Sequence, residues 1–233
     1  LNIPKKFICA AIKLHVGRET DVDRAVEAIE KAKRPVILTG GGVVLSNMSD
    51  RLKHIVQQMH VPVVTTLMGK LRPDTYDAHL GMVGMHGSYA ANMAVTKCDL
   101  LVAIGARFDD RVTGDVEKFR TEREIVHFEI DKVESTRSFH ADISVNGDLR
   151  WSLPLLDEKL AAHETHLADR YEAWRTFVLN MKPLILCHAG PLPDVRFAAE
   201  ALLKKPEMAE CDTIVVTDVG QHQMWRLSSL TEQ

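Results

Sequence analysis

The hydrophobic pattern of the chain switches between the spacing of helices and the short continuous runs of buried strands. Residues 20–33 repeat apolar side chains at helical spacing, which predicts an amphipathic helix. Its apolar face comprises Val22, Val26, Ile29 and Ala32. Thr20 is placed to cap this helix, and Asp21 and Asp23 suit the positive end of the helix dipole.

A strand, helix, strand pattern follows. Residues 36–39 (VILT) are all apolar or β-branched and run directly into three glycines, as a buried strand does before a tight turn. Further strands are predicted at 61–66, 100–104, 125–130 and 143–145, with helices near 52–59 and 88–97. Such alternation predicts a doubly wound α/β domain over roughly residues 21–150, with a mostly parallel sheet and flanking helices.

The two ends of the chain differ from this pattern. Residues 1–7 (LNIPKKF) have the character of a strand that ends at Pro4, and residues 151–180 are helical and polar. Prolines interrupt the following stretch, so residues beyond the helix are interpreted as a connecting segment. Residues 213–217 (TIVVT) predict another strand, with which a new domain is expected to begin.

The amino-acid composition argues against several classes of partner and leaves the fold prediction unchanged. A net charge of −3 and a hydrophobic content of 45% are ordinary for a globular protein and give no electrostatic reason to expect nucleic acid or an anionic membrane as partner. No apolar run approaches the ~18–20 residues that a membrane helix needs, and residues 1–20 lack the regions of a signal peptide. The first residue is Leu rather than Met, so an excerpt of a longer chain is expected.

The four cysteines favour a reducing compartment. They are widely scattered and include no C-x-x-C pair, so neither a zinc site nor a disulfide framework is indicated: Cys9, Cys98, Cys187 and Cys211. We therefore expect a cytoplasmic location. The sequence HETH at 163–166 has the wrong spacing for a zinc-binding H-E-x-x-H, and no metal site is predicted in the chain.

Candidate chemistry gathers where the predicted strands end. In open α/β sheets ligands bind beyond the carboxyl ends of the strands. Glycines 40–42 are compatible either with backbone N–H groups approaching a phosphate or with a plain tight turn. In the segment GARFDDR at 105–111, Arg107 or Arg111 is suited to clamp a pyrophosphate and Asp109 to accept from ribose hydroxyls, unless the loop is only solvated and ion-paired.

Two further strand ends carry candidate ligand contacts. His86 lies among glycines 81, 84 and 87 at the entrance to a predicted helix, where contact with a ligand and a structural role are both open. Glu129 and Asp148 occupy strand ends at which dinucleotide folds place a carboxylate for ribose or adenine, and solvated strand ends are the alternative. No G-x-S-x-G or Walker motif and no cysteine paired with a base is found, so nucleophilic catalysis has no support.

Six segments, in this order, resemble the catalytic large subunit of acetohydroxyacid synthase (acetolactate synthase), a thiamine-diphosphate enzyme. They are RPVILTGGGV, VPVVTTLMGK, LGMVGMHGSYAANMAVTKCDLLVAIGARFDDRVTG, VHFEID, ISVNGD and TDVGQHQMW. The resemblance implies that residues 1–20 end an N-terminal pyrimidine-binding domain, 21–165 form a central FAD-binding domain, 166–212 connect, and 213–233 begin the thiamine-diphosphate-binding domain.

The same resemblance implies the cofactor contacts. FAD, bound without a net redox role, would contact Gly41, Gly42, Thr66, Leu67, Met68, His86, Gly105, Arg107, Asp109, Arg111, Val112, Glu129, Ile130, Gly147 and Asp148. Thiamine diphosphate would contact Gly220, Gln221 and His222. Two departures from the family pattern stand out: the loop after Gly69 is shorter than usual, and Glu129 replaces the usual Asp.

The reaction implied is decarboxylation of pyruvate and its condensation with a second 2-keto acid, giving 2-acetolactate or 2-aceto-2-hydroxybutyrate for valine, leucine and isoleucine synthesis. The family's activating glutamate and magnesium motif match nothing in these residues, so no catalytic or metal residue is assigned and the isolated chain is expected to be inactive. A homodimer or tetramer and a small regulatory subunit are the implied partners. The alternatives are the central domain of another thiamine-diphosphate enzyme, an oxidase or carboligase, or a non-catalytic dinucleotide-binding module.

Overall fold

A computed structural model describes residues 14–69, 76–120, 123–131, 140–161 and 164–182. Two predicted strands, at residues 1–7 and 213–217, lie outside these residues, as do the proposed thiamine-diphosphate contacts Gly220, Gln221 and His222. The described part covers the predicted α/β domain and the helical stretch that follows it.

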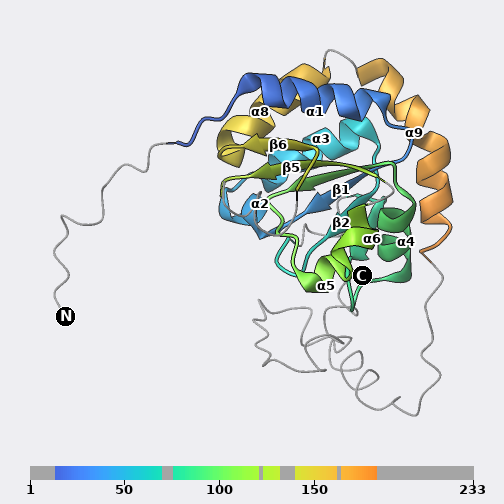
Figure 1. The fold of residues 1–233 in the computed structure, drawn as a ribbon. Helices are drawn as coiled ribbons and strands as arrows, with labels where there is room; N and C mark the ends of the chain where they lie inside the picture. Colours follow the sequence, from blue (N-terminus) through green and yellow to red (C-terminus); the bar gives the residue numbers. More distant parts are fainter. Residues whose placement is uncertain (1–13, 70–75, 121–122, 132–139, 162–163, 183–233) are drawn as a thin grey trace, which may run out of the picture.

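Six parallel strands form one sheet in the order β3-β2-β1-β4-β5-β6 (Figure 1). Their bounds are β1 Pro35–Thr39, β2 Val63–Thr65, β3 His79–Met82, β4 Leu100–Ile104, β5 Glu124–Glu129 and β6 Ile143–Asn146. The central strand β1 pairs with β2 through Ile37 and Val63 and with β4 through Ile37 and Val102. The doubly wound α/β prediction is confirmed, and this strand order is the one typical of dinucleotide-binding domains.

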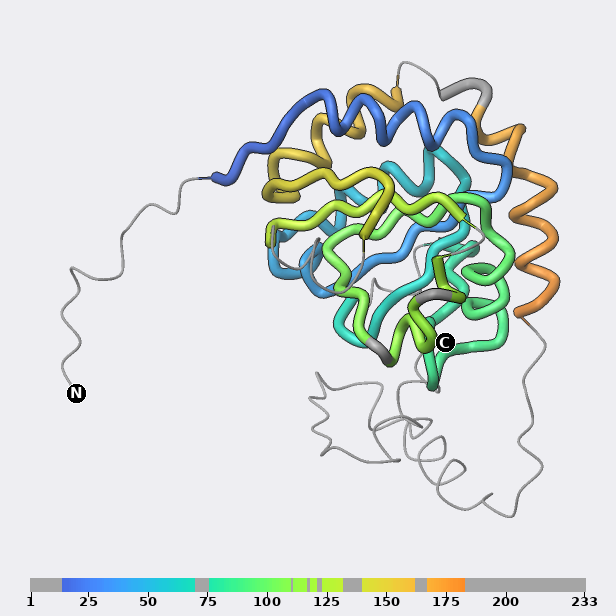
Figure 2. The backbone as a smooth tube through the Cα atoms, in the orientation of Figure 1, coloured from blue at the N-terminus to red at the C-terminus, as the bar shows by residue number. Residues whose placement is uncertain are grey.

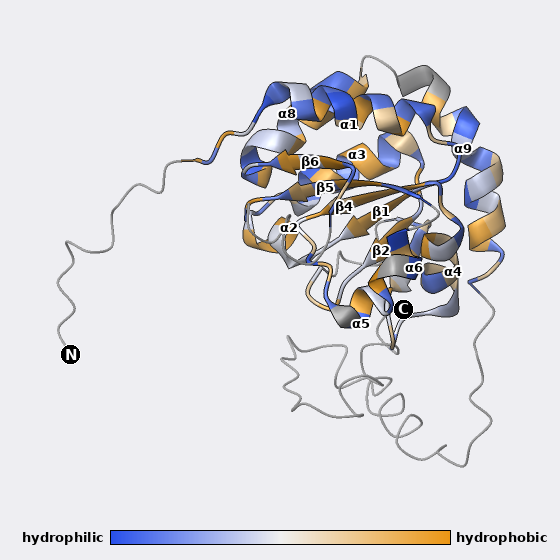
Figure 3. Cartoon of the chain, viewed as in Figure 1, coloured by the Kyte–Doolittle hydropathy of each residue, from blue (hydrophilic) through white to orange (hydrophobic). Residues whose placement is uncertain are grey.

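Helices cover both faces of the sheet (Figure 1). Before and between the strands lie α1 Glu19–Lys31, α2 Gly41–Leu45, α3 Ser49–Met59, α4 Tyr89–Lys97, α5 Asp110–Thr113 and α6 Val116–Arg120, and after β6 follow α8 Leu149–Ala161 and α9 Glu164–Leu179. The central strands β1 and β4 are buried over their whole length, whereas the helices turn polar residues outward (Figure 3). This distribution is the expected one for a parallel sheet that is buried on both sides.

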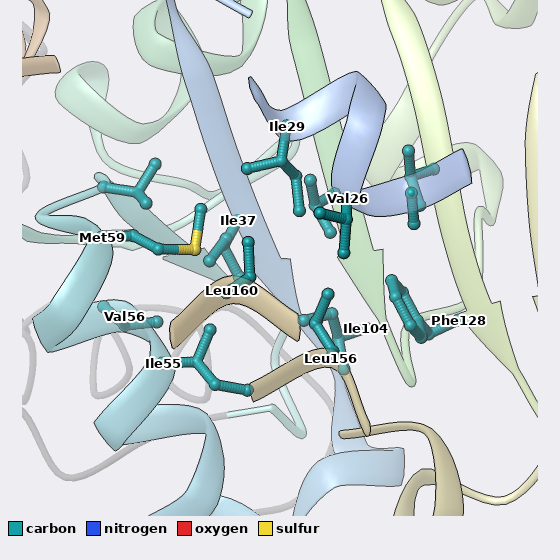
Figure 4. Close-up of a cluster of buried hydrophobic side chains, with 14 of the residues drawn as sticks. Val26, Ile29, Ile37, Ile55, Val56, Met59, Ile104, Phe128, Leu156 and Leu160 are labelled. Carbon is teal, nitrogen blue, oxygen red and sulfur yellow. The ribbon is translucent and has the colours of Figure 1, made fainter. Parts of the chain in front are cut away.

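Two apolar clusters fill the space between sheet and helices. On one face Ile37, Ile104 and Phe128 pack against α1, α3 and α8 (Figure 4). On the other face Val36 and Leu38 join a cluster that includes α4. Because neighbouring residues of β1 point to opposite faces, both faces demand an apolar side chain, which explains the unbroken VILT sequence.

Helix α9 packs on the same core rather than leaving it. Tyr171 is fully buried in the first cluster, and Trp174, 5% exposed, lies in the second. The Trp174 indole donates to the carbonyl oxygen of Pro35 over 3.0 Å, which places α9 at the amino end of β1. In Figure 2 this helix, in orange, runs along the side opposite to the incoming segment at residue 14. This packing on the core thus extends past α9 to Met181, whereas the end of the central domain at residue 165 stays a prediction.

Two local predictions differ from the structure. The helix α1 begins at Glu19 with Arg18 at its N-cap and no side-chain capping bond, so Thr20 lies within the first turn and does not cap it. Strand β3 was not predicted, because its sequence HLGM offers only two strongly apolar residues and a glycine. It adds an edge strand beside β2 and thereby brings the turn that carries His86 to the same edge of the sheet.

Candidate active site: the carboxyl edge of the sheet

The order of the strands reverses its direction at β1, which marks the place where a ligand crevice is expected. From β1 the chain moves to β2 and β3 on one side, and then crosses to β4 on the other side of β1. The loops that leave β1 and β4 consequently diverge, and ligands of doubly wound folds bind in the crevice between them. The predicted FAD contacts within the described residues all follow the carboxyl end of one of the six strands or lie at it.

Gly42 and Gly105 bring these two loops into direct contact. The N–H of Gly42 donates to the carbonyl oxygen of Gly105 over 3.0 Å, and the N–H of Gly40 donates to that of Ile104 over 2.9 Å. A Cβ on Gly42 would lie 2.8 Å from the Cα of Gly105, a distance that real side chains do not tolerate. The sequence left open whether this glycine run binds phosphate or makes a turn. Because the Gly42 N–H donates to the loop after β4, it is already used in a hydrogen bond within the protein.

The loop after β4 alternates inward and outward side chains. Ala106 and Phe108 are buried, with 1% and 7% exposure, whereas Arg107 and Asp109 are exposed. Within the described residues the guanidinium groups of Arg107 and Arg111 make no hydrogen bond or ion pair. Two exposed guanidinium groups in the loop that follows β4 provide donors that suit the oxygens of a pyrophosphate.

Asp109 organises the turn that carries the second arginine. Its Oδ1 accepts from the N–H groups of Arg111 and Val112 over 3.1 and 3.2 Å, and its carbonyl oxygen accepts from the Thr113 hydroxyl over 3.0 Å. This carboxylate therefore caps the short helix α5. A hydrogen bond from a ribose hydroxyl to Asp109 would use Oδ2, because Oδ1 accepts the capping bonds.

The loops after β2 and β3 contribute exposed apolar side chains. Thr66 donates its N–H to the carbonyl oxygen of Thr39 over 2.9 Å, which fixes the β2 loop against β1. Leu67 and Met68 beyond it are 39% and 73% exposed, and Met85 in the β3 turn is 73% exposed. Large apolar side chains exposed at a ligand-binding edge suit a flat aromatic ring.

The turn that carries His86 is held from two sides. The side chain of Asn92 accepts from the N–H of Gly84 over 2.8 Å and donates to its carbonyl oxygen over 3.0 Å. Met85 donates its N–H to the carbonyl oxygen of Arg111 over 3.0 Å, which joins this turn to the loop after β4. The imidazole of His86 is exposed at the end of this turn.

The carboxylates at the ends of β5 and β6 are more constrained than the sequence suggested. Glu129 turns back, and its Oε1 accepts from the N–H groups of Ile130 and Asp131 over 2.9 and 3.1 Å. Gly147 closes this end by donating its N–H to the carbonyl oxygen of Glu129 over 3.1 Å.

Asp148 is held by an arginine that no sequence pattern singles out. Asp148 is 5% exposed. Its carboxylate accepts hydrogen bonds from the backbone N–H, the Nε and the Nη2 of Arg150 over 2.8, 3.0 and 2.6 Å. These hydrogen bonds hold the pKa of Asp148 below its ordinary value. The half-exposed guanidinium of Arg150 thus stands between this carboxylate and solvent.

Besides Arg150, three further residues at this edge were missed by sequence reasoning. Thr39 ends β1 fully buried, and its hydroxyl has no hydrogen-bond partner among the described residues. Asn92 clamps the β3 turn, and His127 contacts the loop after β4 from inside the sheet. All three lie in segments that carry the family resemblance, but no sequence pattern gave their side chains a role, so only the tertiary structure reveals their contacts.

The described residues contain no group of three or more His, Cys, Asp or Glu side chains that could hold a metal ion. The HETH segment is not among the described side chains. No helix in the described ranges combines the length and the apolar character needed to cross a membrane. Cys98 is buried, and burial raises the pKa of its thiol to about 12.

Comparison with known proteins agrees with this geometry. The family model for the central domain of thiamine pyrophosphate enzymes matches residues 22–156. The chain belongs to this family. Its matched range contains the whole six-stranded sheet and all the loops of the carboxyl edge.

Three similar proteins are named acetolactate synthase large subunits. The probable acetolactate synthase large subunit of Methanocaldococcus jannaschii is 41% identical over 217 residues, covering 90% of this chain and 36% of that protein. The acetolactate synthase large subunit of Parasynechococcus marenigrum is 42% identical over 210 residues, covering 90% and 34%. For the isozyme 2 large subunit of Escherichia coli, identity is 36% over 212 residues, covering 88% and 36%. The chain spans about a third of the length of these curated relatives.

Proposed function

We propose that the chain is the FAD-binding central part of an acetolactate synthase large subunit. The observation that carries this proposal is the gathering of the predicted FAD contacts from six separate strand ends at one carboxyl edge, around the contact between Gly42 and Gly105. Family membership and the names of the relatives point to the same activity.

We propose that different parts of this edge hold the different parts of a flavin dinucleotide. Exposed Arg107 and Arg111 suit the pyrophosphate, and the exposed side chains of Leu67, Met68 and Met85 suit the isoalloxazine ring. Glu129 and Asp148 lie at the carboxyl ends of β5 and β6, where the ribose or adenine would be held. Arg150 beside Asp148 is a further donor. These residues bind and orient; thiamine diphosphate with Mg²⁺ supplies the chemistry when bound in the parent protein.

For the parent we propose decarboxylation of pyruvate and condensation with a second 2-keto acid to give 2-acetolactate or 2-aceto-2-hydroxybutyrate. We further propose a homodimer or tetramer with a small regulatory subunit, since the three relatives described above are named large subunits. A cytoplasmic location accords with the absence of any paired cysteine motif. Residues 213–233, with Gly220, Gln221 and His222, would meet thiamine diphosphate.

Titration with FAD tests the cofactor assignment. The chain, and in parallel the full-length protein that carries it, is titrated with FAD while flavin fluorescence is followed. Replacing Arg107→Ala removes charge-assisted hydrogen bonds to phosphate, so we expect the dissociation constant to rise about tenfold or more. The matched control is Arg24→Ala on α1, because its guanidinium reaches the carbonyl oxygen of Asp142 ahead of β6, away from the carboxyl edge.

The possible results of this titration distinguish the proposed FAD site from its alternatives. Binding by the wild type that Arg107→Ala weakens and Arg24→Ala leaves unchanged supports the proposed site. Equal binding by all three proteins removes Arg107 from the site. A full-length protein that binds no FAD but turns over pyruvate contradicts the FAD assignment, whereas one that binds FAD without pyruvate turnover favours a related oxidase or carboligase.

A further inference from the structure

His127 connects the interior of the sheet to the loop that presents Arg107 and Asp109. It lies in β5 with its side chain 2% exposed. Its Nε2 is 2.8 Å from the carbonyl oxygen of Ala106. A carbonyl oxygen can only accept, so Nε2 carries the proton and donates it to Ala106.

The ring of His127 touches the second inward residue of the same loop. Its centroid lies 5.0 Å from that of Phe108, with the planes at 69°, an edge-to-face contact. Phe108 in turn meets Phe119 of α6 at 6.0 Å. Thus His127 contacts both Ala106 and Phe108, the two residues whose inward positions determine that Arg107 and Asp109 face outward.

The same imidazole also lies beside another residue of the candidate site. Its Nε2 is 3.8 Å from Oε2 of Glu129, while Oε1 of that carboxylate is occupied by the N–H groups of Ile130 and Asp131. His127 is therefore placed between the end of β5 and the loop that leaves β4. Because the His127 side chain is buried, it can influence a bound ligand only through the residues that it contacts.

We propose that His127 is the positioning residue of the carboxyl edge: its hydrogen bond to Ala106 and its contact with Phe108 fix the loop 105–109 so that Arg107 and Asp109 face the cofactor. This inference rests on the proposed FAD site for its ligand. The fixing of the loop is a property of the chain itself and can be tested without any cofactor.

Two substitutions separate the hydrogen bond from simple filling of space. His127→Gln keeps an N–H donor at a similar reach, whereas His127→Leu fills the site without a donor. The wild type and both variants are compared by hydrogen–deuterium exchange of residues 105–113, with residues 35–39 of β1 as the internal reference. FAD titration of the same three proteins follows, and thermal unfolding verifies that each is folded.

We expect His127→Leu to speed amide exchange in residues 105–113 about tenfold without a matching change in β1, and to weaken FAD binding by a similar factor. His127→Gln should restore both quantities to within about threefold of the wild type. Equal exchange in the wild type and His127→Leu, or a glutamine variant as impaired as the leucine variant, overturns the proposal. Failure of the wild type to bind FAD would count against the proposed function alone, because the exchange comparison still decides the role of His127.

Discussion

Gly105 adopts a left-handed backbone conformation with φ of +58°, and its Cα lies against Gly42 in the loop that leaves β1. A Cβ on Gly105 would lie 2.9 Å from the Cα of Gly42. The two strands on either side of the crevice therefore end in loops that meet backbone to backbone. This backbone contact lies at the switch point of the sheet, and the exposed residues Arg107 and Asp109 follow it directly in the chain.

Replacing Gly105→Ala should destabilise the protein more than its backbone conformation alone explains. Gly114 provides a matched control, because it has φ of +59° but no described atom beyond its chain neighbours within 4 Å of the place that an alanine Cβ would occupy. The left-handed conformation costs an Ala about 1–2 kcal/mol at either site. At Gly105 the contact with Gly42 adds overpacking of about 1–3 kcal/mol.

Urea denaturation of the two variants and the wild type measures this difference. We expect Gly114→Ala to lower the free energy of unfolding by the smaller amount and Gly105→Ala by roughly twice that amount or more. Equal losses at both positions would show that the contact between the loops carries no energetic weight. FAD affinity should fall in Gly105→Ala only.

The Asp148–Arg150 pair should make stability depend on pH. Because Arg150 lowers the pKa of Asp148, the folded state binds this proton less readily than the unfolded state does. The stabilisation is therefore fully present above the unfolded pKa of about 3.9 and is lost as pH falls through the lower folded value. Arg150→Gln should accordingly reduce stability at pH 7 and cost progressively less as the pH falls below about 4.

Unfolding free energies measured between neutral and acid pH test this dependence. Arg24→Gln is the control, since Arg24 lies 3.8 Å from Asp21 with most of its own side chain exposed. Its effect should stay small at every pH, as exposed pairs contribute at most about 1 kcal/mol. A difference between wild type and Arg150→Gln that does not change with pH would mean that Arg150 stabilises the protein through packing rather than through the Asp148 carboxylate.

The sheet was predictable wherever its strands are buried on both faces. The runs at 36–39 and 100–104 are almost wholly apolar, and the run at 125–130 largely so, because parallel strands between two helical layers face a core on each side. Strand β3 escaped prediction because His79 and Gly81 interrupt its pattern, and only pairing with β2 makes it a strand. The rule that ligands bind at carboxyl ends then placed the candidate residues at one edge.

The pairings within that edge could not be predicted in the same way. That Arg150 closes on Asp148, or that the Ala106 carbonyl meets His127, depends on side-chain rotamers and on how neighbouring loops pack. No spacing in the sequence encodes such contacts. The glycine run shows the same limit, since its N–H groups were candidate phosphate ligands until the opposing loop showed that Gly42 is already engaged.

The family resemblance placed most of helix α9, beyond residue 165, in the connecting segment, whereas its burial predicts that α9 unfolds together with the sheet. Trp174 is 5% exposed and donates to the carbonyl oxygen of Pro35 over 3.0 Å, so Trp174→Ala should lower the free energy of unfolding by about 3–5 kcal/mol. Phe177 is an aromatic control on the same helix. It is 45% exposed and stacks on Trp174, and Phe177→Ala should cost about 1 kcal/mol or less.

Denaturant unfolding followed by circular dichroism compares the two variants with the wild type. A single transition shifted strongly by Trp174→Ala and weakly by Phe177→Ala would show that α9 unfolds together with the sheet. If the two substitutions cost the same, or if α9 melts in a separate earlier transition, the cooperative unit ends near residue 165. In that case β1 stays folded after α9 has unfolded. The contacts of Tyr171 and Trp174 with the core then add little to the stability of the candidate site at the carboxyl edge of the sheet.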